Sequence, residues 1–187
     1  DLAGGANEQW LPLVVTAGDE KPFGQRYGSA TKQDVLQFLT FDRENPNSIL
    51  SSVRAARENA RSVREVISRE MWEHINRFYL TLKDTDASRA SIDNTADFYE
   101  QVRVSGQQFM GVTDATMTHG EAGHFCRMGR LIERADKTSR ILDVKYYLLL
   151  PSPADVGSTL DDIQWSALLQ SASGLEMYRQ RHGLISP

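Results

Sequence analysis

The amino-acid sequence predicts an all-α protein that folds as an up-and-down bundle of long antiparallel helices. Apolar residues recur every three or four positions over long stretches, which is the period of one helix face. No stretch alternates apolar and polar residues as a half-buried strand does. Short polar segments join the helical stretches, and short connections favour antiparallel neighbours.

The length of 187 residues suits one helical domain, and we expect residues 1–187 to form it. Scattered glycines and prolines predict an irregular segment over residues 1–30, with a short helix near residues 10–15 followed by loop. A further short helix begins at Thr31 or Lys32 and ends in the segment 42–46, where Pro46 interrupts the pattern.

The longest predicted helix covers residues 48–83, a stretch without glycine or proline. Its apolar residues follow one another at steps of three or four: Ile49, Val53, Ala56, Ala60, Val63, Ile67, Met71, Ile75, Phe78 and Leu82. This spacing predicts one continuous helix that bends near Met71, where the steps are irregular.

Three more helices follow along the chain. Asp93 is placed to cap a third helix that runs to about residue 117. A fourth begins near Thr118, which forms a capping-box pattern with Glu121, and prolines 151 and 153 end it. A last helix over residues 160–173 precedes an Arg-rich tail. The fourth helix has the most regular apolar stripe: Phe125, Met128, Ile132, Ala135, Ser139, Leu142, Tyr146 and Leu149.

Composition excludes several classes of function. With 21 basic and 25 acidic residues the net charge is −4, which gives no overall field for nucleic acid or an anionic membrane. No apolar run reaches the roughly 20 residues of a membrane span. One cysteine, Cys126, and no signal-peptide pattern favour a cytoplasmic protein, in which Cys126 is a small buried apolar residue.

Two helices carry charges that could bind a ligand. Arg54, Arg57, Arg61 and Arg64 form a stripe on one flank of the second helix, and guanidinium groups bind carboxylates and phosphates through paired donors. Alternatively, Glu58 and Glu65 neutralise this stripe on a solvated face, because each follows an arginine by four residues.

The fourth helix carries a mixed block that includes Arg127, Arg130, Glu133, Arg134, Asp136, Lys137, Arg140 and Asp143. The spacing predicts ion pairs from Glu133 to Lys137 and from Asp136 to Arg140.

Metal-site patterns are weak. A di-metal helical bundle needs two Glu-x-x-His pairs, and Glu121 with His124 supplies only one of them. His119 and His124 are five residues apart and diverge around a helix. We therefore expect neither metal nor cofactor.

The block from Gly129 to Lys145, which contains Glu133–Arg134, resembles the signature of the bacterial alpha-E domain family, named for a Glu-Arg motif. Further matching blocks cover residues 52–61, 70–73, 113–117, 162–165 and 168–173. The resemblance implies a helical protein without an established activity, associated with ATP-grasp-like and transglutaminase-like proteins in an amide-forming or peptide-modifying system. It also implies that the chain is a fragment of a longer alpha-E protein, because an earlier copy of the motif is missing before Asp1.

Two hypotheses of function follow. The first is an accessory helical module that binds a partner enzyme or its acidic substrate through two faces, made of Arg54, Arg57, Arg61 and Arg64, and of Arg130, Glu133, Arg134, Asp136 and Arg140. The second is an enzyme with a polar pocket between helices, where Glu133 and arginines act as acid, base and anion clamp. By periodicity Glu133 and Arg134 lie off the main apolar stripe and should be solvated. The resemblance to a family named for this pair implies a more demanding environment, and we predict that Glu133 is at least half buried and contacts an arginine of another helix.

Overall fold

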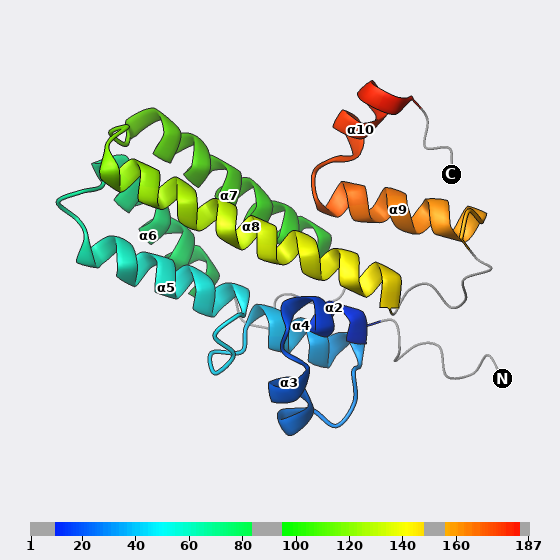
Figure 1. The fold of residues 1–187 in the computed structure, drawn as a ribbon. Coiled ribbons are helices and arrows are strands. Elements are labelled where there is room, and N and C mark those ends of the chain that lie inside the picture. The colour runs from blue at the N-terminus through cyan, green and yellow to red at the C-terminus, as the bar shows by residue number, and fades with distance from the viewer. Residues whose placement is uncertain (1–9, 84–94, 148–155, 184–187) are drawn as a thin grey trace. The chain divides into compact units, whose positions relative to one another are not determined.

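The computed structural model describes residues 10–83, 95–147 and 156–183, and every regular element in these ranges is a helix (Figure 1). The all-α prediction is confirmed. The helices are α2 (Leu11–Ala17), α3 (Glu20–Arg26), α4 (Lys32–Thr40), α5 (Ile49–Ser62), α6 (Arg69–Lys83), α7 (Thr95–Thr116), α8 (Glu121–Tyr147), α9 (Thr159–Ser171) and α10 (Leu175–His182).

The chain divides into two compact units. Unit 1 consists of Asp1–Lys21 and Arg130–Pro187, and unit 2 is Pro22–Gly129. Helices α3 and α8 each contribute residues to both units. The organisation as a single domain stays a prediction. None of the described helices is both long enough and apolar enough to cross a bilayer.

Unit 2 begins with an aromatic cluster between α3 and α4. Phe23 stacks on Tyr27 at 5.0 Å between ring centroids, and both rings meet the buried Phe38 edge-on. This cluster stabilises α3, which lies where the sequence predicted loop. Pro22 is compatible with it because the residue lies in the first helical turn, where no intrahelical N–H bond is lost.

The single helix predicted over residues 48–83 is wrong. The chain forms α5 and α6 with a turn over residues 63–68 between them. Each of the two helices buries one face. The three- and four-residue apolar spacing therefore continues through residues 63–68, although the helix is interrupted there. The signal for the break is Ser68, whose hydroxyl accepts a hydrogen bond from the Met71 amide at 3.0 Å and so caps α6.

Helices α5, α6 and α7 lie side by side in unit 2 (Figure 1). α5 and α6 are antiparallel, because Arg64 contacts Trp72 near the turn whereas Arg57 contacts Tyr79 farther from it. α6 and α7 are antiparallel as well. Ser68 bonds Thr116 at 2.6 Å, and His74 bonds the carbonyl of Ser105 at 2.9 Å. The buried apolar residues of α6 are Met71, Ile75 and Leu82.

Unit 1 pairs α8 with α9 in opposite directions. Lys145 of α8 bonds Asp161 near the start of α9, and Arg134 approaches the carbonyl of Ala172 at its end. α9 lies where the sequence predicted the last helix, capped by Ser158. The segment expected as an Arg-rich tail is helical and forms α10.

The apolar stripe predicted for the fourth helix is largely exposed in α8. Phe125, Met128, Ile132 and Tyr146 each expose between 49% and 61% of their surface. The periodicity shows that α8 is amphipathic, but burial on α8 falls instead on Val144 and Lys145 near its end. Asp93, the residue predicted to cap the third helix, lies outside the described residues. So does Leu149, the last residue of the predicted stripe.

The start of α8 also differs from prediction. α8 begins at Glu121, three residues after Thr118, and no hydrogen bond of a Thr118–Glu121 capping box is present in the described residues. Instead, Gly123 lies against the main chain of Thr118, where a Cβ atom would come within 2.5 Å of the carbonyl oxygen. The backbone of residues 118–123 therefore depends on a residue without a side chain at position 123.

We predict that Gly123→Ala destabilises the protein by about 1–3 kcal/mol, because backbone cannot move aside cheaply. The matched control is Gly111→Ala in α7, where a Cβ atom meets nothing within 4 Å. Alanine there should stabilise the helix by about 0.5–1 kcal/mol. Urea unfolding measures both changes. Equal effects of the two substitutions would contradict the contact with Thr118.

Candidate functional site

The arginines of α5 form the first candidate site, and Arg57 is at its centre. Its Nε atom donates to Oδ1 of Asn76 at 2.7 Å. Its guanidinium carbon lies 5.0 Å from the ring centroid of Tyr79 and 5.6 Å from that of Trp72. Positions 72, 76 and 79 lie on one face of α6, since they are separated by four and three residues. Arg57 is therefore a contact between α5 and α6 and only in part a solvated charge.

Arg64 extends this contact beyond the end of α5. The guanidinium carbon of Arg64 lies 5.1 Å from the ring centroid of Trp72, so two arginines contact one indole. Attraction between a cation and an aromatic face is strongest for tryptophan and orients both groups. The result is a surface of arginine and aromatic side chains, which we call the α5–α6 face: Arg54, Arg57, Arg61, Arg64, Trp72 and Tyr79.

The acidic partners on this face are not those that the spacing predicted. Glu58 accepts from Arg57 at 2.6 Å and lies 3.4 Å from Arg61. Neither the Arg54–Glu58 pair nor the Arg61–Glu65 pair is present among the described contacts. The reason for the second is local, because α5 ends at Ser62 and Glu65 lies in the turn. Of the two acids predicted to neutralise the stripe, Glu58 does so and Glu65 does not among these described contacts. The partners of Glu58 are Arg57 and Arg61, and not Arg54 as the spacing predicted.

A small recess lies beside Arg54. It has a volume of about 30 Å³ and is lined by Arg43, Leu50, Ser51, Arg54, Tyr79 and Lys83. The residues come from the segment before α5, the first turn of α5 and the last turns of α6, which the antiparallel hairpin brings together. Arg43 and Lys83 could not be predicted as members of this site, because no spacing rule connects them with Arg54 before the hairpin is known.

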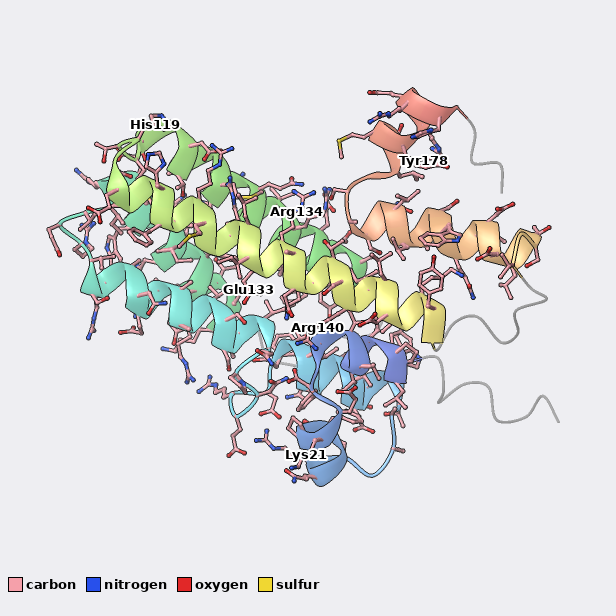
Figure 2. All side chains as sticks on the ribbon, viewed as in Figure 1. Lys21, His119, Glu133, Arg134, Arg140 and Tyr178 are labelled. Atoms are coloured by element: carbon pink, nitrogen blue, oxygen red, sulfur yellow. The ribbon has the colours of Figure 1, made fainter. Side chains whose placement is uncertain are left out.

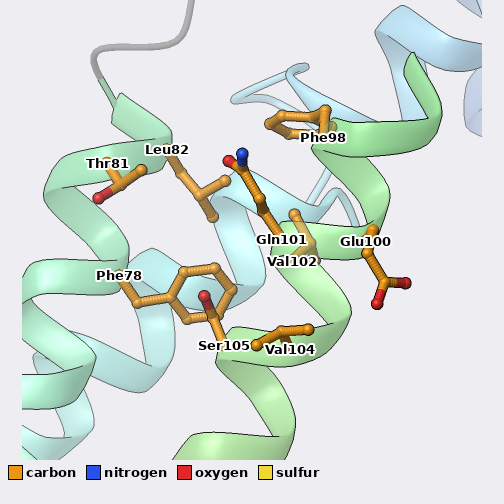
Figure 3. A pocket seen from close by; sticks show the side chains of 9 residues that line it. All are labelled: Phe78, Thr81, Leu82, Phe98, Glu100, Gln101, Val102, Val104 and Ser105. Carbon is orange, nitrogen blue, oxygen red and sulfur yellow. The ribbon is translucent and has the colours of Figure 1, made fainter. Parts of the chain in front are cut away.

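A larger groove of about 280 Å³ lies between α6 and α7 (Figure 3). Its walls are mostly apolar and include Phe78, Leu82, Phe98 and Val102, with Thr81, Glu100, Gln101 and Ser105 among the polar lining residues. Glu100, the carboxylate among the described lining residues, accepts a hydrogen bond from Arg103, which lowers the pKa of that carboxyl. These lining residues do not form the cluster of polar groups that acid–base chemistry needs.

Unit 1 contains the second candidate site, on α8, where Figure 2 labels Glu133, Arg134 and Arg140. The predicted pair between Asp136 and Arg140 is confirmed. Nε of Arg140 lies 3.0 Å from both carboxylate oxygens. This hydrogen bond raises the pKa of Arg140, and the nearby charges of Glu20 and Asp19 raise it further.

Arg140 also fills the turn between α2 and α3. Gly18 ends α2 with φ of 79°, and a Cβ atom there would lie 2.6 Å from an Nη atom of Arg140. Glycine therefore serves two purposes at this position, because it adopts the left-handed conformation and leaves space for the guanidinium. Arg140 is consequently a structural contact within unit 1.

The two residues of the Glu-Arg pair differ in their surroundings. Arg134 reaches the carbonyl of Ala172 at the end of α9 at 3.5 Å, where a cation complements the negative end of the helix dipole. Glu133 is exposed, and among the described contacts it has neither the predicted pair with Lys137 nor an arginine of another helix. Lys137 instead lies 3.4 Å from Asp136. Arg130 is partly buried.

The most buried charges of unit 1 were not predicted as a site. Lys145 is 1% exposed, and its Nζ atom donates to Asp161 at 2.6 Å and to Gln164 at 2.9 Å. The second oxygen of Asp161 accepts from the Gly157 amide at 3.0 Å. The hydrogen bond from the Gly157 amide has the largest effect in lowering the pKa of Asp161, and the hydrogen bond from Lys145 lowers it further. Spacing could not find this network, because its two charges are 16 residues apart on different helices.

The described residues contain no group of three or more side chains of the metal-binding types. Cys126 is exposed, so its predicted burial as an apolar residue is wrong. The reason is the same as for the apolar stripe of α8, since Cys126 lies next to the exposed Phe125.

The architecture and the charged helices define a helical protein without a recognisable catalytic constellation in its described part. Over residues 1–187 the chain matches a family described as a predicted alpha-helical domain with a conserved ER motif. The chain belongs to this Alpha-E family. Glu133–Arg134 is the single Glu-Arg dipeptide in the sequence. Neither a curated protein nor a solved structure gives a significant match.

We predict that Lys145→Ala lowers the melting temperature by about 10 °C, because it leaves the Asp161 carboxylate buried without its cation. The control is Lys137→Ala on the same helix, an exposed lysine that should shift the melting temperature by about 2 °C or less. Thermal unfolding followed by circular dichroism measures both. Similar small shifts would show that the buried pair does not join α8 to α9.

The lowered pKa of Asp161 predicts a pH dependence. A carboxyl whose pKa is lower in the folded state contributes stability above its unfolded pKa, near 3.8, and loses it as the pH falls through the folded value. The stability advantage of the native protein over Asp161→Asn should therefore be constant from pH 7 to about pH 5. It should shrink below about pH 4. Urea unfolding across this range measures the difference, and an advantage that does not decrease at all between pH 5 and pH 2 would contradict the assignment.

Proposed function

We propose that this protein is an accessory helical module that binds an acidic partner through the α5–α6 face. The observation that carries the proposal is the arrangement of Arg57 and Arg64 over Trp72. Arginine and aromatic residues are enriched at the centres of protein interfaces, and a guanidinium held on a ring loses little freedom on binding. The face is thus built in advance for carboxylates of a partner.

Of the two faces considered from the sequence, the contacts favour that of α5. On α8 the arginines Arg134 and Arg140 are engaged within unit 1, by the end of α9 and by Asp136 with the α2–α3 turn. Among the described ion pairs of α5, the exposed Arg61 has one acid, Glu58 at 3.4 Å, which it shares with Arg57, and the exposed Arg54 has none. More positive charge therefore remains available on α5.

The enzyme hypothesis receives less support from the same residues. Glu133, its acid or base, is exposed, and the recess and the groove described above both lie in unit 2 and have no Glu133 in their walls. As partner we propose an ATP-grasp-like or transglutaminase-like protein in the cytoplasm. This part of the proposal is supported by the association that the family resemblance implies.

The test uses charge reversal and a binding assay with the ATP-grasp-like or transglutaminase-like protein that we propose as the partner. The double variant Arg54→Glu/Arg61→Glu should bind about tenfold more weakly or worse, and binding of the native protein should weaken as salt rises. The matched control, Arg103→Glu/Arg127→Glu, changes the net charge equally at exposed positions of α7 and α8. Native affinity of the first variant, or equal losses in both, would overturn the proposal.

A further inference from the structure

The described residues that line the recess beside Arg54 include no acid. Three of them are cationic, Arg43, Arg54 and Lys83. The nearby carboxylates are engaged elsewhere. Asp42 and Glu44 lie 2.8 and 3.4 Å from Arg26, and Glu58 binds two other arginines of α5. In the described part of the chain, no salt bridge joins any of the three cations to an acid.

From this arrangement we infer that the recess binds one phosphate group, and that this group belongs to the acidic ligand that the α5–α6 face binds. The inference rests on the proposed function and gives its ligand a chemical class. It assigns roles to Arg43 and Lys83, which the arginine stripe of α5 does not include.

Size permits an oxyanion and excludes a larger ring. A volume of about 30 Å³ exceeds the roughly 10–15 Å³ that one water requires, so the recess accepts about two oxygen atoms while the rest of the group stays outside. The buried Ser51 and Leu50 form part of its wall, and the ring of Tyr79 forms another part. The residues that bring the charge are exposed, so a ligand can reach them.

The positive charge of the recess favours a phosphate over a carboxylate as its ligand. Three cations without an internal acid attract a dianion more strongly than a monoanion, because the attraction scales with the product of the charges. Two guanidinium groups supply paired donors that fit phosphate oxygens, and the ammonium group of Lys83 adds a point charge. The first turn of α5 lies in the same wall, and its partial positive charge acts in the same direction.

The test is an NMR titration of the native protein, without any partner, against inorganic phosphate at pH 7.5. Sodium chloride holds the ionic strength constant, and acetate is titrated in parallel. Phosphate should cause saturable shifts of the Leu50, Ser51 and Lys83 amides, with a Kd on the order of 1–10 mM because the site is exposed. Acetate should bind about tenfold more weakly. Linear, unsaturable shifts, or equal binding of acetate, would overturn the inference.

Variants locate the site. Arg43→Met and Lys83→Met should each weaken phosphate binding about tenfold, whereas Arg103→Met on α7 should not change it. A peptide with one phosphoserine is compared with inorganic phosphate and with the unmodified peptide, to distinguish a phosphorylated chain from a free phosphate as the source. Unchanged binding in Arg43→Met and Lys83→Met would overturn the assignment of the recess. Because the partner is absent, a negative result here leaves the charge-reversal test of partner binding unaffected.

Discussion

Lys145 places an ammonium group in the interior of unit 1, and the pairing of α8 with α9 depends on what it meets there. Its bonds to Asp161 and Gln164 compensate for the loss of water around the charge. Asp161 is held in turn by the Gly157 amide, so the start of α9 is tied to the end of α8. The pair cannot be loosened at one side without leaving the other charge buried. This requirement fixes the register of the two helices more strictly than exchangeable apolar contacts would.

A similar device joins α5 to α6 in unit 2, with aromatic rings in place of a carboxylate. Arg57 crosses from α5 to Tyr79 and Trp72, and Asn76 accepts from its Nε atom. α6 also contributes apolar packing through buried side chains such as that of Met71. The long basic side chain adds direction to that packing, since a guanidinium must lie over a ring face and meet an acceptor in its own plane. In both units, therefore, a cation from one helix specifies where the next helix lies.

These contacts explain which parts of the structure the sequence could predict. Periodicity depends on one helix at a time, so it correctly placed α9 and, within a few residues, α7. It could not detect the turn after Ser62, because two helices that pack on each other produce the same apolar steps as one long helix. It failed for the stripe of α8, including Phe125, because amphipathicity does not show what covers a face. The candidate site was half predictable: the arginine row follows from spacing, but the recess needs Lys83, which only the hairpin brings to Arg54.

The arginines of the two charged helices, α5 and α8, differ in what they contact, and one of those on α8 is the arginine of the Glu-Arg pair. A motif named by its residues does not say whether they bind a ligand or maintain the fold. In this chain Arg134 approaches the end of α9 and Arg140 occupies the turn at Gly18, so these two arginines of α8 lie against the main chain of unit 1. Arg57 of α5 contacts the Tyr79 side chain instead, and the described lining of the recess beside Arg54 includes no acid. A charge already engaged within the fold contributes little to binding, which is why the proposed recognition surface lies on α5, whereas Arg134 contacts the end of α9 within unit 1.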